Sequence, residues 1–274
     1  MRTLQTAVLR LGVTAFTITM AAGVGEAFGK KDGVVQSISH GEIDWGERAI
    51  TATGSGAPNL DAANAAAARL GAERSAKMDA FRNLLEAVKG VRVAAGATAG
   101  AMMKTDKQLR TQIEGAVRNF EVLDTKYYSD GGVDVVVRVP LDDVVGDALL
   151  ADAGSKAAKA DEASGDVTGI IINAKGIDIA PALAPKVVDP SGKPVYSAAF
   201  ATDDAVAEHG VVEYAKSIAA ARKSKRVSGN PILIKAMERA ADSETDVVVS
   251  KKDAAKLSQH AALLAAARVI VVVD

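Results

Sequence analysis

The chain has 274 residues, which allows one large domain or two ordinary ones. Its 33 basic and 34 acidic residues balance, whereas a nucleic-acid binder would show a basic excess or stripe. The absence of cysteine excludes disulfides, cysteine-based metal sites and nucleophiles, and the lipid-bearing cysteine of a lipoprotein. Apolar residues make up 49% of the chain but aromatic residues only 4%, so its cores must consist of Ala, Val, Leu and Ile.

Residues 1–27 have the pattern of a signal peptide for export. Arg2 and Arg10 supply the positive region, and an apolar run over residues 11–24 follows. Gly25 and Ala27 place small residues where a signal peptidase reads them. The apolar run is shorter than the roughly 20 residues that span a bilayer, so cleavage after Ala27 is favoured over an uncleaved anchor. We expect a periplasmic protein whose residues 28–41 are a flexible N-terminal segment.

A first domain is predicted over residues 42–150. It begins with a strand over residues 44–54 that bulges at Gly46. An alanine-rich helix follows, with Asp61 as its cap and Gly90 as its stop. The apolar positions at helical spacing in this helix are Leu70, Met78, Phe81, Leu84, Leu85 and Val88.

The rest of this domain predicts a strand over residues 91–100, a second helix and a hairpin. Thr105 or Asp106 caps the second helix, whose apolar stripe is Leu109, Ile113, Val117 and Phe120. The hairpin turns at residues 130–132, and alternate residues from Val133 to Val139 share one face. A short helix over residues 141–150 closes the domain. The order strand–helix–strand–helix–strand–strand predicts an α+β fold: a small mixed or antiparallel sheet with two helices on one face.

Residues 151–166 are small, polar and charged, which is typical of a linker. A second domain of α/β type is predicted over residues 167–274. It contains strands over residues 167–176, 230–236 and 245–250, a hairpin over 186–196 and a helix over 211–226. Ser250 and Asp253 form an approximate capping box for a further helix. The valine-rich run over residues 268–274 predicts a strand buried on both faces.

No catalytic, cofactor-binding or metal-binding residues are assigned. His40, His209 and His260 lack the spacing of metal ligands. No GxSxG elbow or phosphate-binding loop occurs, although a serine triad made of distant residues stays open. Three carboxylates are interpreted as helix caps: Asp142, Asp143 and Asp147. The basic cluster Arg222–Arg226 is interpreted as a solvated helix end.

The few aromatic residues are interpreted as structural. Trp45, the single tryptophan, is expected to anchor the core of the first domain beside the small residues of the alanine-rich helix, with an interface role as the alternative. Alternation sends one of Tyr127 and Tyr128 into the core and the other outward.

Three stretches of the first domain carry a family resemblance. The matching positions are Trp45, Ala52, Gly54 and Gly56, then Arg82, Leu84, Leu85, Glu86, Gly90 and Val91, then Ile113, Gly115, Val117, Gly131 and residues 133–141. Over about residues 42–145 the chain thus resembles the Lpp-twenty lipoprotein-like family of exported bacterial proteins. The resemblance implies an α+β domain associated with the outer membrane, with flagellar ring and basal-disk components among the relatives. The lipidated cysteine of many relatives is missing here, so no lipid anchor is expected.

These observations predict a non-enzymatic structural protein of the cell envelope, with no cofactor. It would assemble with itself or dock on an outer-membrane complex, for which the resemblance suggests a flagellar one. The alternative is a periplasmic binding module that holds a small molecule, glycan or polypeptide in the cleft between its two domains, because domain junctions are frequent ligand sites. An envelope hydrolase with a dispersed triad is the third hypothesis.

Overall fold

The structure is a computed structural model that describes residues 33–38, 40–144 and 166–274. The predicted signal peptide and residues 151–165 of the predicted linker lie outside this part of the chain. The described residues form an α+β unit followed by a second unit of α/β type, as the sequence predicts. Among the described helices, none combines the length and the apolar character that a membrane crossing requires.

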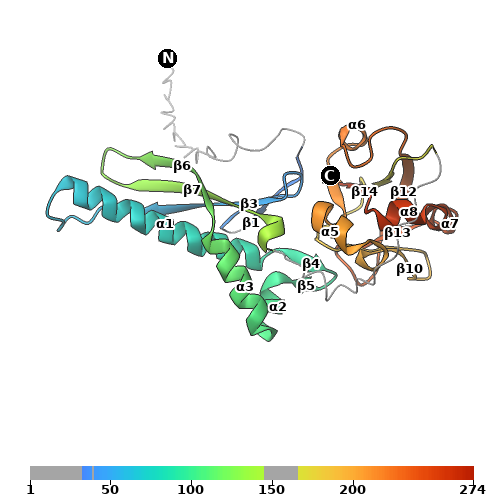
Figure 1. Ribbon diagram of the computed structural model, residues 1–274, viewed down its shortest axis with the longest axis horizontal. Coiled ribbons are helices and arrows are strands. Elements are labelled where there is room, and N and C mark those ends of the chain that lie inside the picture. The colour runs from blue at the N-terminus through green and yellow to red at the C-terminus, as the bar shows by residue number, and fades with distance from the viewer. Residues whose placement is uncertain (1–32, 39, 145–165) are drawn as a thin grey trace, which may run out of the picture.

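The first half is built on a five-stranded antiparallel sheet in the order β1-β2-β3-β7-β6. Its strands are β1 (Val35–Ile38), β2 (Gly41–Asp44), β3 (Ala49–Gly56), β6 (Glu121–Tyr127) and β7 (Val133–Pro140). Helix α1 (Ala65–Lys89) runs along β3 and β7 on one face of this sheet (Figure 1). The hairpin of β4 (Arg92–Ala94) and β5 (Ala97–Thr98), then α2 (Ala99–Thr105) and α3 (Lys107–Arg118), project from the same end of α1.

Small residues let α1 lie unusually close to β3. A Cβ atom added to Gly54 would stand 2.0 Å from the backbone nitrogen of Ala80, and one added to Gly56 would stand 2.0 Å from the carbonyl oxygen of Ala72. Ala72, Ala76 and Ala80 are fully buried on the facing side of the helix. The glycines at the end of β3 and the alanines of α1 are therefore the two sides of one close contact.

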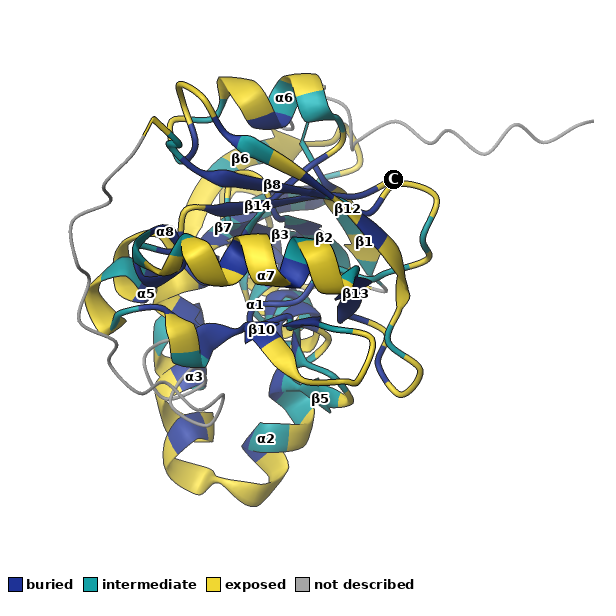
Figure 2. Ribbon diagram, turned by 90° about the vertical axis from the view of Figure 1, so that its right-hand side faces the viewer, coloured by how far each residue is buried: buried dark blue, intermediate teal, exposed yellow. Residues whose placement is uncertain are grey.

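The second half is built on a seven-stranded sheet in the order β10-β9-β13-β12-β8-β14-β11. Its strands are β8 (Ile170–Asn173), β9 (Val187–Val188), β10 (Pro194–Tyr196), β11 (Glu213–Ala215), β12 (Ile232–Arg239), β13 (Val247–Val249) and β14 (Val269–Val272). Its helices are η1 (Ala198–Phe200), α5 (Asp203–His209), α6 (Ile218–Lys223), α7 (Lys251–Gln259) and α8 (Ala261–Ala265). Figure 2 shows α7 across one face of the sheet and α6 on the opposite side.

Several elements of the second half agree with the sequence-based expectation. The hairpin of β9 and β10 turns at residues 189–192, and Ser250 caps α7 by accepting a hydrogen bond from the Asp253 backbone N–H. Strand β14 lies between β8 and β11, runs parallel to both and is buried along its whole length. The predicted helix over residues 211–226 is wrong in its first part, because residues 213–215 form β11 and only residues 218–223 are helical.

The start of the first half also differs from its prediction. Residues 35–38 of the expected flexible segment are the strand β1, which pairs with β2. The expected bulged strand over residues 44–54 is a turn between β2 and β3 followed by the first part of β3. Asp44 creates this turn, because its Oδ1 accepts the backbone N–H groups of Gly46 and Glu47, both at 2.9 Å. A carboxylate that bonds the backbone two and three residues later stabilises a turn where propensity alone favoured a strand.

Two expectations about α1 need correction. The helix is capped by Asn64 and not by Asp61, since the Asn64 side chain accepts the Ala67 N–H. Leu70 and Met78 do not face the core: 57% and 60% of their surfaces are exposed. The buried face is the alanine face, because only residues with small side chains fit above the glycines of β3. Gly90 does end the helix, Asp106 caps α3, and the valines of β7 alternate as predicted.

Candidate functional site

The carboxyl ends of four strands form one edge of the second sheet. Strands β11, β14, β8 and β12 are parallel, and their carboxyl ends form a row made by Ala215, Val272, Asn173 and Lys235. In open α/β sheets this edge is where ligands usually bind. The first half contacts the segment that follows β8, and Figure 1 shows β4 and β5 beside the second half. The junction is therefore the natural place to look for a site.

Trp45 lies at this junction. Its ring meets the ring of Tyr214 of β11 edge to face, with the centroids 5.6 Å apart, and only 3% of Trp45 is exposed. The indole N–H donates a hydrogen bond to the Gln36 amide oxygen at 3.1 Å. Trp45 is thus buried, as expected, but it joins the cores of the two halves. The buried apolar side chains of both halves form one continuous cluster.

Tyr214 fixes the same junction through its hydroxyl. The hydroxyl donates to the Ala182 carbonyl oxygen and accepts the Ala182 backbone N–H, both at 2.9 Å. Burial raises the pKa of Tyr214 well above its ordinary value. The chain beyond Ala182 then pairs with β4, as Leu183 N–H donates to the Arg92 carbonyl oxygen at 3.0 Å and Ala184 N–H to that of Val93 at 2.7 Å. The segment that follows β8 is therefore held by both halves.

Between the halves lies a groove of about 590 Å³, which we call the junction groove. The first half lines it with Gln36, Ile38, Gly90, Arg92, Ala94, Gly96, Ala97 and Thr98. The second half lines it with Arg239, Ala241, Asp242, Ser243, Glu244 and Thr245. The second-half residues are the end of β12, past its parallel pairing with β8, and the turn into β13. Its size is within the range of ordinary ligand pockets.

The charges of the junction groove cancel formally, with two arginines against Asp242 and Glu244. Arg92 lies 3.4 Å from a carboxylate oxygen of Glu244 and so bridges the two halves. Arg239 lies 3.9 Å from the carboxylate of Asp178, whose side chain is fully exposed. Such solvent-exposed pairs contribute little to stability. The groove is therefore suited to a polar ligand with donors and acceptors, and less to a polyanion.

A hydrogen-bond network fixes the wall formed by residues 240–246. The Ser243 hydroxyl accepts the backbone N–H groups of Thr245 and Asp246 at 3.1 and 3.0 Å. The Asp246 carboxylate accepts from the Thr245 hydroxyl and from the Lys186 backbone N–H. All three side chains of this network (Ser243, Thr245 and Asp246) are buried. The wall is a preorganised turn, and the sequence offered no signal for it beyond its polar residues.

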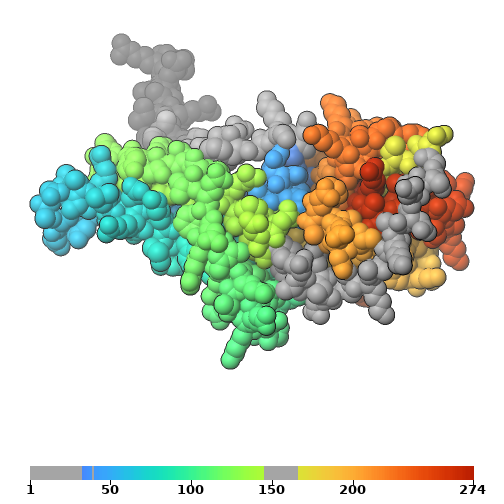
Figure 3. Space-filling view, in the orientation of Figure 1, coloured from blue at the N-terminus to red at the C-terminus, as the bar shows by residue number. Residues whose placement is uncertain are grey.

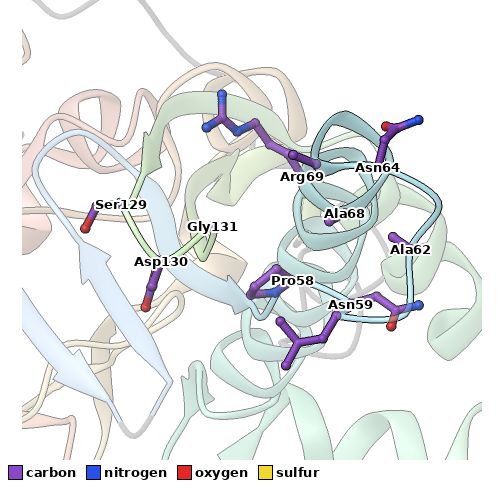
Figure 4. A pocket seen from close by; sticks show the side chains of 11 residues that line it. Pro58, Asn59, Ala62, Asn64, Ala68, Arg69, Ser129, Asp130 and Gly131 are labelled. Carbon is purple, nitrogen blue, oxygen red and sulfur yellow. The ribbon is translucent and has the colours of Figure 1, made fainter.

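A second hollow, of about 380 Å³, lies at the far end of the first half, between the start of α1 and the turn of the β6–β7 hairpin (Figure 4). Pro58, Leu60 and three alanines supply the apolar part of its lining. Its polar side chains already have roles within the chain: Asn64 caps α1, and Arg69 stands 5.6 Å from the centroid of the Tyr127 ring. In Figure 4 the polar ends of Asn64 and Arg69 point away from Pro58. No polar groups converge there, so the junction groove is the better candidate.

The basic cluster Arg222–Arg226 is only partly the solvated helix end that was expected. Arg222 and Lys223 are exposed at the end of α6, but Arg226 turns inward. Its guanidinium donates to the carbonyl oxygens of Ala267 at 2.6 Å and His209 at 2.8 Å. Burial lowers the pKa of Arg226 to about 10. Arg226 is a structural residue, which its position in a charged run did not reveal.

The other residues considered from the sequence are not brought together. Within residues 33–38, 40–144 and 166–274, no cluster of metal-ligating side chains occurs. Asp142 lies in the helical residues 141–144 and pairs with the Arg48 guanidinium, while Asp147 lies outside the described residues. Tyr127 and Tyr128 are both exposed, contrary to the expected alternation, and their hydroxyls donate to Glu73 and Asp134.

The comparison with protein families corrects the resemblance seen in the sequence. Residues 169–274 match the family of the second domain of Treponema pallidum Tp0624. The match covers the second half, whereas the Lpp-twenty lipoprotein-like family expected over residues 42–145 is not found, so that assignment is wrong. Short spacings of Ala, Gly and Val were too common a pattern to identify it. No curated protein matches the chain.

Proposed function

We propose that this protein is a non-enzymatic binding module of the bacterial cell envelope, and that the junction groove is its binding site. The export pattern of residues 1–27 supports the location, and the absence of a recognisable catalytic motif supports the non-enzymatic role. The flagellar and outer-membrane association is set aside, because it depended on the family assignment that the comparison corrected.

The groove itself carries the proposal. Both halves line it, and a buried hydrogen-bond network holds one of its walls in place. A preformed concave surface at a junction, with a few oriented polar groups, is what a ligand site requires. The contact of Trp45 with Tyr214 is one of those that join the two halves.

Thermal unfolding in the presence of a panel of amino acids, sugars and short peptides tests this function. Ala241 lines the groove and is exposed, so Ala241→Trp should fill the groove without disturbing the core. Ala65 lines the distal hollow and is also exposed, which makes Ala65→Trp the matched control.

A ligand at 100 times its Kd stabilises the protein by about 2.7 kcal/mol. We expect a raised Tm in the wild type and Ala65→Trp but not in Ala241→Trp. A shift that survives Ala241→Trp, or no shift with any compound, would contradict the proposal.

A structural role is the second candidate, and one observation favours it. The outer side of β6 has no strand partner among the described residues, and Val122 and Tyr127 on it are 40% and 48% exposed. An open edge can pair with another chain. Light scattering after size-exclusion chromatography separates the candidates: an oligomer that Val122→Lys dissociates would favour assembly, and a monomer would favour the binding module.

A further inference from the structure

The strand β1 forms both a wall of the junction groove and an outer edge of the first sheet. Gln36 and Ile38 line the groove, while β2 is the single strand that pairs with β1 in the described part of the chain. The backbone groups on the outer side of an edge strand are a template for another extended chain. A polypeptide can add to such an edge, with its backbone bonded to the strand and alternate side chains directed into the adjoining pocket.

The side chains of the groove favour a polypeptide over a ring-shaped ligand. None of its 14 lining residues is aromatic, so the groove offers no aromatic ring on which a planar ligand could stack. Small residues of the hairpin formed by β4 and β5, namely Ala94 and Ala97 on the strands and Gly96 in the turn, leave room along its side of the groove. The lining residues therefore suit a narrow, extended occupant.

Arg239 is the charged group of the groove that is best placed to meet a ligand. Its side chain is 43% exposed, and its Nη1 atom is 3.4 Å from the Asp178 carbonyl oxygen, at the long limit for a hydrogen bond. A guanidinium that is held so weakly within the chain can still offer its donors to a carboxylate. Glu244 is already paired with Arg92, and together with Asp242 it would repel a ligand that carries several negative charges.

We propose that the occupant of the junction groove is an extended polypeptide segment that adds to the edge of β1 and places one carboxylate against Arg239. This inference rests on the proposed function, because it names the ligand class of the same groove. It predicts recognition through the backbone of the ligand together with a single acidic group, and hence moderate tolerance of the other side chains.

The experiment uses nine-residue peptides selected from a random library displayed on phage against the full-length protein, then synthesised and titrated by fluorescence anisotropy. Arg239→Gln should weaken binding of a selected peptide by tenfold or more. Lys235→Gln is the matched control, because Lys235 is an exposed cation on the same strand that does not line the groove, and it should leave the Kd within twofold. Replacing the peptide's acidic residue by its amide should weaken binding to the wild type but cause no further loss in Arg239→Gln.

Single N-methylation along the peptide tests strand addition. Because every second N–H of an added strand bonds the edge, methylation should weaken binding at alternate positions. Two results would contradict this inference and leave the proposed function standing: loss of binding in Ala241→Trp without an alternating effect of methylation, or binding by Arg239→Gln that equals that of the wild type.

Two other results would contradict the inference directly: no peptide is selected, or the peptides bind Ala241→Trp unchanged. In that case the compound panel decides whether the proposed function fails as well.

Discussion

At the scale of single residues, the contact of β3 with α1 depends on the absence of a Cβ atom at Gly54. A Cβ there would lie 2.0 Å from the Ala80 nitrogen and 2.3 Å from the Ala76 carbonyl oxygen, both of them backbone atoms that cannot rotate away. We expect Gly54→Ala to destabilise the fold by about 2 kcal/mol or more, since overpacking of a core typically costs 1–3 kcal/mol. Urea unfolding would measure the change in the free energy of unfolding.

Gly71→Ala is the control for this substitution. Gly71 is an exposed residue inside α1 with nothing within 4 Å of an added Cβ. Alanine there should stabilise the protein by about 0.5–1 kcal/mol, because glycine is unfavourable in a helix. Equal effects of the two substitutions would contradict the close-packing account.

Tyr214 gives the junction a predictable response to alkali. Burial raises the pKa of Tyr214 in the folded state above the ordinary value of 10.0. The contribution of Tyr214 to the free energy of unfolding is therefore constant below pH 10 and declines as the pH rises above 10. The expected loss is about 1.4 kcal/mol per pH unit for this group. Tyr214→Phe removes the group, along with its hydrogen bond to the Ala182 carbonyl oxygen. It should be less stable at pH 8 but lose less stability between pH 10 and pH 11. An unchanged loss would show that Tyr214 is not buried as described.

Structural features that depend on neighbouring residues in the chain were predicted correctly from the sequence. Asp106 as a cap and the alternating valines of β7 follow from neighbouring positions in the chain. The role of Arg226 could not be found in this way, because its carbonyl partners come from two loops 15 or more residues away. The partnership of Trp45 with Tyr214 likewise joins distant positions, so the sequence indicated burial but not the neighbour.

At the scale of elements, β14 is the strand on which the second sheet depends. It pairs with β8 on one side and β11 on the other, and all four of its residues are buried. Deleting residues 269–274 should expose both neighbours and abolish the cooperative thermal transition of the protein. Differential scanning calorimetry would show this, and a truncated protein with an unchanged melting curve would contradict the assignment.

The elements were predicted best where one pattern dominated. The hairpin of β6 and β7 has turn residues between two strands, and β14 has an uninterrupted apolar run. The helix over residues 211–226 was misassigned because Tyr214 and Ala215 fit either structure, and pairing with β14 decided the outcome. The turn after Asp44 was not predicted, because it depends on the hydrogen bonds of one carboxylate, and the periodicity of apolar residues carries no information about such bonds.

At the scale of the whole molecule, the two halves share one core, although Figure 3 shows the start of α1 extending far from the second half. Trp45, the single tryptophan, lies at the junction and reports on it. We expect its fluorescence and the far-ultraviolet circular dichroism to change together in urea, because coincident transitions indicate cooperative unfolding. An earlier fluorescence transition would mean that the halves separate before they unfold.

If the junction groove is the binding site, a bound peptide should slow hydrogen exchange in the residues that surround it. We expect slower exchange with a selected peptide than without it in residues 35–38, 92–98 and 239–246. We expect no change at residues 58–69 and 129–131 around the distal hollow, or along β6. Protection confined to either of those regions, with the groove unaffected, would contradict the account.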